Sequence, residues 1–202
     1  MRFRPTIVVL AAGQGSRFRG TPHKLVQALG GSSVLGTTVQ HAIASHLPVV
    51  LVTTAALVPL VSGQLATRDI VVLSDAESQR GVGYSIAAGV AERAGAQGWL
   101  VLPGDMPRVQ PATLRAVGAL LEMHPVACAQ YRGRRGHPVG FAAELYSELI
   151  QLTGDEGARR LVARYPAQGL EVDDPGVLIG VDTEADLDAL RALEPSDSAE
   201  GG

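Results

Sequence analysis

Residues 6–12 read TIVVLAA, an apolar and β-branched run without polar alternation. Such a run predicts a strand buried on both faces, as in a parallel sheet covered by helices. The same pattern recurs at 48–54, 70–73 and 99–102. Several doubly buried strands require a large core, and 202 residues with 46% apolar and 18% charged side chains can fill one.

Segments of helical length and period lie between and after these strands, at 34–45, 57–66, 82–93 and 112–123. Alternating strands and helices predict a single Rossmann-like α/β domain with a doubly wound, mostly parallel sheet and helices on both faces. Short strands at 126–131 and 139–142, joined by a polar turn at 132–138, then predict a small β-hairpin insertion. Helices at 144–152 and 158–165, strands near 170–172 and 177–181, and a helix at 184–193 complete the predicted domain at 1–194. Residues 195–202 are small, polar and acidic and predict a disordered tail.

Composition excludes several classes of function. Seventeen basic and 20 acidic residues give a net charge of −3, so a nucleic-acid or anionic-membrane partner is not expected. No apolar stretch approaches the roughly 20 residues of a membrane span, and no export signal is recognisable. Cys128 is the one cysteine, so an internal disulfide is excluded and a cytoplasmic setting is expected. Cys128 itself is expected in the core rather than as a nucleophile.

A glycine-rich segment follows the first predicted strand directly. Gly13 and Gly15 allow the backbone to turn its N–H groups toward an anion, and Arg17 and Lys24 add charges that suit a triphosphate. Lys24 is also the one lysine of the chain. The spacing is not that of a P-loop, and Phe18 stands where the dinucleotide-binding fingerprint needs Gly or Ala. A plain strand-to-helix turn is the alternative interpretation.

Two aspartates follow predicted strands. Ligands of doubly wound sheets bind at the carboxyl ends of strands where the chain order reverses, typically between the first and fourth strands. We therefore expect Asp105, after the strand at 99–102, to face Gly13 across that crevice and to hold Mg²⁺, with Asp182 as a second ligand. The alternatives are that Asp105 caps the helix predicted after residue 111 and that Asp182 is the N-cap of the last helix.

Together these motifs resemble those of the nucleotidyltransferases that make the dinucleotide forms of the molybdenum cofactor. The chain is most similar to the molybdenum cofactor cytidylyltransferases. The resemblance rests on LAAGQGSRF at 10–18 followed by Lys24, and on GDMP at 104–107. It extends from residue 6 to about 190 through GVGYS at 81–85, GHPVGF at 136–141 and GDEGAR at 154–159.

The resemblance implies that Arg17 and the loop backbone hold a triphosphate, that Lys24 neutralises charge at its α-phosphate, and that Asp105 and Asp182 bind Mg²⁺. The nucleotide-binding residues that it implies are Leu10, Ala11, Ala12, Gly13, Gln14, Gly15, Gly81, Ser85 and Gly104. The Ala11-Ala12 pair resembles the cytidylyl type and favours CTP. The family usually has its lysine closer behind Arg-Phe-Gly, so Lys24 is spaced differently here.

The resemblance also implies an acceptor, a pterin with a terminal phosphate, over 136–141 and 154–159. His137, Asp155 and Arg159 are the contact residues expected there. A turn histidine bonded to the backbone is the alternative for His137, and a solvated surface position is the alternative for Arg159. The protein partner implied is a transient one, a molybdoenzyme or its chaperone.

The expected reaction is in-line transfer of CMP from CTP to the acceptor phosphate, with pyrophosphate leaving. A guanylyltransferase or another transferase of small phosphates is one alternative. A non-catalytic carrier of nucleotide or cofactor is another. An NAD-dependent oxidoreductase is disfavoured, because Thr53 and Thr54 stand where an acidic residue would close the second strand.

Overall fold

The computed structural model describes residues 3–13 and 23–194. Three predicted nucleotide contacts, Gln14, Gly15 and Arg17, lie outside the described residues, as does the predicted tail at 195–202. Within the described ranges, no helix combines the length and apolar character that a membrane crossing would need.

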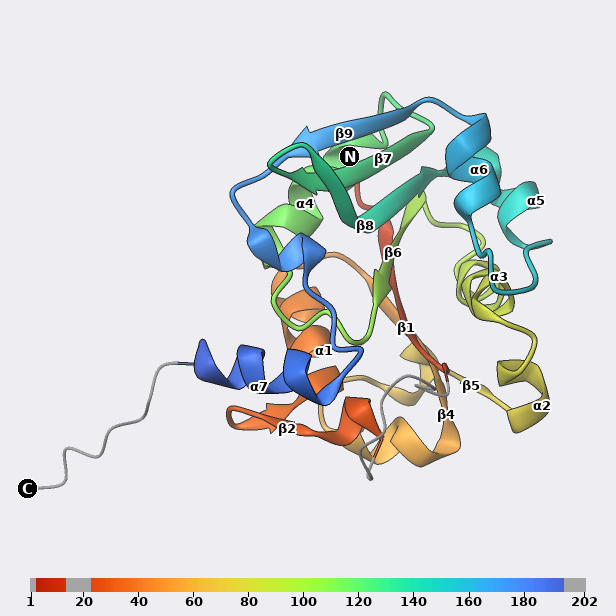
Figure 1. The fold of residues 1–202 in the computed structure, drawn as a ribbon. Helices are drawn as coiled ribbons and strands as arrows, with labels where there is room; N and C mark the ends of the chain where they lie inside the picture. Colours follow the sequence, from red (N-terminus) through yellow and green to blue (C-terminus); the bar gives the residue numbers. More distant parts are fainter. Residues whose placement is uncertain (1–2, 14–22, 195–202) are drawn as a thin grey trace, which may run out of the picture.

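A seven-stranded sheet in the order β5-β4-β1-β6-β8-β7-β9 forms the centre of the fold (Figure 1). The strands, in that order, are Ile70–Leu73, Val49–Thr54, Thr6–Ala11, Gly98–Pro103, Arg134–Ala142, Val126–Tyr131 and Ala167–Glu171. The pairs β5-β4, β4-β1, β1-β6 and β7-β9 are parallel, whereas β8 is antiparallel to both β6 and β7. The prediction of a doubly wound, mostly parallel sheet with a small hairpin insertion is therefore confirmed. The chain order reverses between β1 and β6, where such sheets form a crevice.

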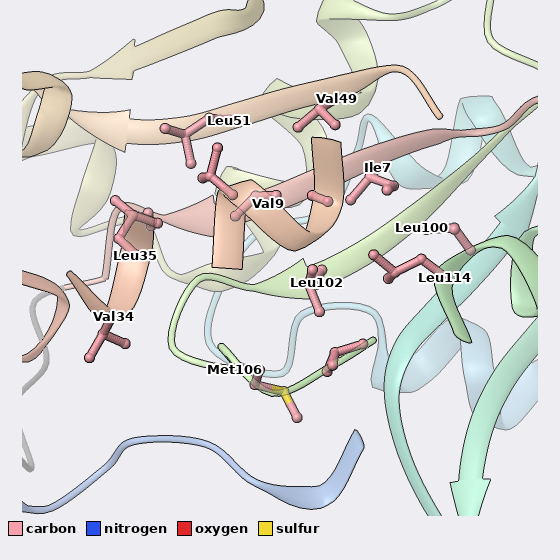
Figure 2. Packing of buried hydrophobic residues seen from close by; sticks show 14 of the residues in the cluster. Ile7, Val9, Val34, Leu35, Val49, Leu51, Leu100, Leu102, Met106 and Leu114 are labelled. Atoms are coloured by element: carbon pink, nitrogen blue, oxygen red, sulfur yellow. The ribbon is translucent and has the colours of Figure 1, made fainter. Parts of the chain in front are cut away.

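Helices cover both faces because residues of the central strand alternate between two cores. Ile7 and Val9 of β1 belong to one core and Val8 to the other, all with no exposed surface. The first core is closed by α1, α4 and α7 (Val34–Ala44, Pro111–Leu120 and Glu184–Ala192), and the second by α3, α5 and α6 (Val82–Glu92, Tyr146–Leu149 and Arg159–Arg164). Figure 1 shows these two helix layers on opposite sides of the sheet, and Figure 2 shows the packing of the first core.

The remaining elements are short. They are the strands β2 and β3 (Ala28–Leu29 and Ser32–Ser33), helix α2 (Asp75–Ser78), and the 3₁₀ helices Lys24–Val26, Ala55–Leu60, Thr67–Asp69, Ala143–Leu145 and Pro175–Leu178. The strands β2 and β3 form a separate two-stranded antiparallel sheet.

Four local predictions were wrong. The helix predicted at 57–66 is the 3₁₀ helix Ala55–Leu60 followed by turns, and Pro59 inside it cannot donate a backbone hydrogen bond. The strand predicted at 177–181 is the end of a 3₁₀ helix and irregular chain, whose valines are buried by packing rather than by strand pairing. The turn predicted at 132–138 is much shorter, because Tyr131 already pairs with Arg134. The helix at 144–152 breaks into a 3₁₀ helix and α5.

Candidate active site

Lys24, Asp105 and Asp182 meet at the carboxyl ends of β1 and β6, and we call these three residues the lysine–carboxylate cluster. Lys24 Nζ lies 2.5 Å from Asp105 Oδ2 and 3.3 Å from Asp182 Oδ1. The side chains of Lys24 and Asp105 are 13% and 19% exposed, whereas that of Asp182 is 52% exposed. The fold thus brings together the lysine and both aspartates selected from the sequence, although 158 residues separate the outermost pair.

Backbone contacts hold the two strand ends together. The Gly104 N–H donates to the Leu10 carbonyl at 2.7 Å, and the Thr38 hydroxyl donates to the Gly104 carbonyl at 2.8 Å. A Cβ at Gly104 would lie 2.8 Å from the Leu10 oxygen, so a side chain there would force the strand ends apart. Gly104 therefore holds the ends of β1 and β6 close together, and it does not line the cavity itself.

The capping alternatives for both aspartates are wrong. Thr183, not Asp182, is the N-cap of α7, and Asp182 is tied to β6 because the Val181 N–H donates to the Asp105 carbonyl at 2.9 Å. The carboxylate at the start of α4 is that of Asp174, which is 5% exposed and accepts hydrogen bonds from the Gln110 N–H, the Thr113 hydroxyl and the Gly176 N–H. This structural aspartate could not be selected from the sequence, because it stands in an acidic, proline-containing stretch without a periodic signal.

His23, also missed, connects the lysine to the end of β1. Its Nδ1 accepts the Leu25 N–H at 3.2 Å, and its Nε2 lies 3.2 Å from the Gly13 carbonyl oxygen. Because Nδ1 acts as an acceptor, Nε2 carries the proton and donates to Gly13. The imidazole thereby holds the 3₁₀ helix that begins at Lys24 against the loop end of β1.

A cavity of about 440 Å³ is lined by Lys24 and Asp105 of the lysine–carboxylate cluster, whereas Asp182 lies outside its lining. Predicted residues in its lining are Leu10, Ala11, Ala12, Gly13, Lys24, Gly81, Ser85, Asp105 and Asp155. The first four end β1, Gly81 and Ser85 belong to the start of α3, and Asp155 comes from the loop before α6. Residues far apart in sequence therefore converge on one cavity.

Gly81 brings the loop at 153–155 into this cavity. Its φ is +91°, and a Cβ there would collide with the backbone of Gly154. The Gly83 N–H donates to the Gly154 carbonyl, and the Gly154 N–H donates to the Arg80 carbonyl, both at 2.9 Å. The segments GVGYS and GDEGAR are thus joined at the backbone.

A second cavity, of about 630 Å³, adjoins the first and shares Leu10, Val82, Pro103 and Asp155 with it. His137 and Arg159 line it, together with Arg135, which the sequence analysis did not select. The three predicted acceptor contacts are therefore brought together, and Asp155 borders both cavities.

His137 lies within β8 rather than in a turn. Its ring makes no hydrogen bond to any residue in the described parts of the chain, so the backbone-bonded turn histidine is a wrong interpretation. Burial lowers the pKa of His137, and the nearby Asp105 carboxylate opposes this effect. The imidazole in the lining of the second cavity therefore favours its neutral form.

The two aspartates fit a divalent cation. Their oxygens already converge on one positive charge, the Lys24 ammonium group. No group of three or more metal-binding side chains occurs among the described residues. Mg²⁺ is commonly held by one or two carboxylates, with substrate phosphates and water completing its coordination.

A doubly wound sheet with cations, carboxylates and a cavity at its switch crevice defines an α/β nucleotide-binding domain. More specifically, the MobA-like NTP transferase domain matches residues 7–169, and the chain belongs to this family of nucleotidyltransferases. Rv0371c from Mycobacterium tuberculosis H37Rv is 32% identical with a TM-score of 0.79, over 94% of this chain and 98% of that one. Another crystal structure of that protein is a complex with manganese.

Two further relatives show how far the similarity extends. A nucleotidyl transferase from Methanothermobacter is 25% identical with a TM-score of 0.77, over 93% of this chain and 95% of that one. The purine catabolism protein PucB from Bacillus subtilis is 32% identical over 120 residues, which are 57% of this chain. The match spans 58% of PucB.

Proposed function

We propose that this protein transfers CMP from CTP to the terminal phosphate of molybdopterin and releases pyrophosphate. The observation that carries the proposal is the position of Lys24 and Asp105 in the lining of a cavity that adjoins a second one. Transfer between two substrates requires each to have its own site, with the reacting phosphates meeting at the border. A cytoplasmic location stays a prediction.

In this proposal the first cavity binds the nucleotide. The backbone of residues 10–13 and the start of α3, with Gly81 and Ser85, surround it. Lys24 neutralises charge at the α-phosphate, as a preorganised cation does in phosphoryl transfer. The proposal also assigns triphosphate binding to Gln14, Gly15 and Arg17, which are not among the described residues. CTP is proposed because the Ala11-Ala12 pair resembles the cytidylyl type.

Asp105 and Asp182 are the residues that would hold Mg²⁺. Bound there, the ion would supply charge neutralisation to the phosphate oxygens. Lys24 must then release at least one of its carboxylate contacts and turn to the substrate, because its ammonium group lies between the two aspartates.

The second cavity is proposed to bind the acceptor. Ile86, Val101, Phe141 and Val162 give it apolar walls that suit a flat heterocycle. Asp155 can accept hydrogen bonds from N–H groups of the acceptor's ring. His137 and Arg159 are proposed to contact the acceptor's phosphate. An acceptor phosphate is already ionised, so its attack on the α-phosphorus needs no general base. A P–O bond forms there as the bond to the β-phosphate oxygen breaks.

Pyrophosphate release from CTP, GTP, ATP and UTP, each with Mg²⁺ and with or without molybdopterin, tests the proposal. We expect release with CTP and molybdopterin together. Lys24→Ala should lower kcat by on the order of 10²-fold, and Asp105→Ala should abolish the metal-dependent reaction. Arg93→Ala, which breaks the Arg93–Asp69 ion pair away from the site, is the matched control.

Other outcomes point to other functions. A preference for GTP would make the protein a guanylyltransferase. Release with another small phosphate in place of molybdopterin would change the acceptor. Binding of CTP and molybdopterin without any pyrophosphate release would favour a carrier that hands the cofactor to a molybdoenzyme or its chaperone.

A further inference from the structure

One face of β8 carries a gradient from charged to apolar side chains. Arg135, His137, Val139 and Phe141 alternate along the strand and all line the second cavity. Val139 and Phe141 share one face of the strand because they are two residues apart. The pairing of β8 with β7 shifts register between Val139 and Arg135, so it is the shared cavity lining that places Arg135 and His137 in the same wall. The wall is cationic or polar at Arg135 and His137 and apolar at Val139 and Phe141.

The strand register gives this gradient a direction. β8 is antiparallel to β6, with Trp99 opposite Phe141 and Val101 opposite Val139. Going from Phe141 to Val139 therefore follows β6 toward its carboxyl end, after which Asp105 lies. The pairing with β6 ends at Val139, and Arg135 pairs with Gln130 of β7. The charged end of the wall is thus the end nearer the lysine–carboxylate cluster, and the apolar end lies farther from it. The Asp105 carboxylate also influences the pKa of His137, in agreement with this direction.

Arg135 has no carboxylate partner among residues 3–13 and 23–194. Neither Arg135 nor Arg159 makes an ion pair within the described parts of the chain, whereas Arg93 and Arg164 are paired with Asp69 and Glu148. Burial raises the pKa of the Cys128 thiol, which also lines the cavity, and Arg135 opposes that rise. The guanidinium group therefore acts on the cavity side of the sheet.

We propose that Arg135 determines specificity for a phosphorylated acceptor by holding the acceptor's phosphate at the charged end of the second cavity, with the ring system against Val139. This inference rests on the proposed function, because it concerns the acceptor of that reaction. A guanidinium group presents a planar pair of donors that matches two phosphate oxygens. The acceptor is thereby oriented with its phosphate toward the lysine–carboxylate cluster.

A pair of ligands that differ only in the phosphate tests this assignment. Binding of 6-hydroxymethylpterin phosphate and of unphosphorylated 6-hydroxymethylpterin to the full-length protein is measured by the change in pterin fluorescence. We expect the phosphorylated ligand to bind about tenfold more tightly or better, as one charge-assisted hydrogen-bonding pair provides. Arg135→Ala should remove most of that preference and leave the affinity for the unphosphorylated ligand unchanged.

Arg134→Ala is the matched control. Arg134 neighbours Arg135, carries the same charge and lies on the opposite face of β8, outside the cavity lining. This variant should keep the preference for phosphate. Arg135→Lys should keep part of it, since charge remains while the planar pair of donors is lost.

Three outcomes would overturn the inference. They are an equal affinity of the wild type for both ligands, no binding of either, and an equal loss of preference in Arg134→Ala and Arg135→Ala. The last would indicate a general effect of positive charge. Failure of the proposed function is recognised separately, as the absence of pyrophosphate release in the nucleotide panel, which does not depend on this binding measurement.

Discussion

Replacing Lys24 by methionine should make the protein more responsive to divalent cations while lowering its activity. Methionine keeps an unbranched side chain of similar length and removes the charge. In the wild type, the ammonium group lies between Asp105 and Asp182 and compensates both carboxylates. In Lys24→Met the two carboxylates lose the ammonium group that they share, and their mutual repulsion is no longer offset by it.

The distances set the size of the effect. Asp105 Oδ2 and Asp182 Oδ1 lie at most about 5.8 Å apart, because they are 2.5 Å and 3.3 Å from the same nitrogen. Two like charges at that separation repel by about 3 kcal/mol at an effective dielectric constant of 20. Solvent screens much of this, since Asp182 is 52% exposed, leaving about 1 kcal/mol. For a chain of this length, that lowers the melting temperature by roughly 2–4 °C.

Thermal unfolding with and without Mg²⁺ or Mn²⁺, in the absence of nucleotide, measures the prediction. A cation that binds between the carboxylates removes their repulsion and takes the place of the lysine. The metal-induced rise in melting temperature should therefore be larger in Lys24→Met than in the wild type. Arg93→Met removes an ion pair of similar exposure elsewhere and should lower stability without changing the response to metal.

The reasoning is refuted if Lys24→Met gains no more stability from the metal than the wild type does. That result would mean that the two aspartates do not share a cation. A larger metal response with unchanged turnover would instead leave the shared site intact and remove Lys24 from the proposed catalytic step.

Three further predictions concern residues around the site. Asp174→Ala should lower the free energy of unfolding by about 2–3 kcal/mol, since it leaves three hydrogen-bond donors unpaired, two of them buried. Urea denaturation measures this, and a loss within error of zero would contradict it. Gly81→Ala should raise the KM for the nucleotide more than the KM for the acceptor, because the new Cβ would meet the Gly154 backbone beside the first cavity. Equal changes in both KM values would argue against an effect confined to the first cavity. Burial lowers the pKa of His137 below 6.5, so the unfolded chain binds a proton on this imidazole more readily than the folded chain, and stability should fall as the pH drops below about 6.5. His137→Gln should flatten that decline in urea midpoints measured across this range, and an unchanged pH dependence would exclude His137 as its source.

The strands of the parallel part of the sheet could be predicted because each is a short, uninterrupted apolar run. β1, β4, β5 and β6 all lie within two residues of their expected bounds. Burial on both faces leaves a direct pattern in the sequence. The irregular elements leave no such pattern, and Val177 is the clearest example, since an apolar residue buried by packing resembles one buried in a strand.

The site could be predicted only as separate pieces. The glycine-rich segment, the lysine and the aspartate after a buried strand each carry a local chemical signal. His23, Arg135 and Asp174 carry none, because the role of each depends on partners from distant segments. The capping assignments also failed for this reason, since a neighbouring residue or a distant carboxylate satisfied the helix start instead.

The sequence by itself determined the class of fold and the kinds of groups available, because hydrophobic periodicity and side-chain chemistry are local properties of the chain. Only the tertiary structure decided that Lys24 lies between two aspartates and that Arg135 and His137 line the same cavity. Those distances depend on strand order and register, which arise from packing across the whole sheet.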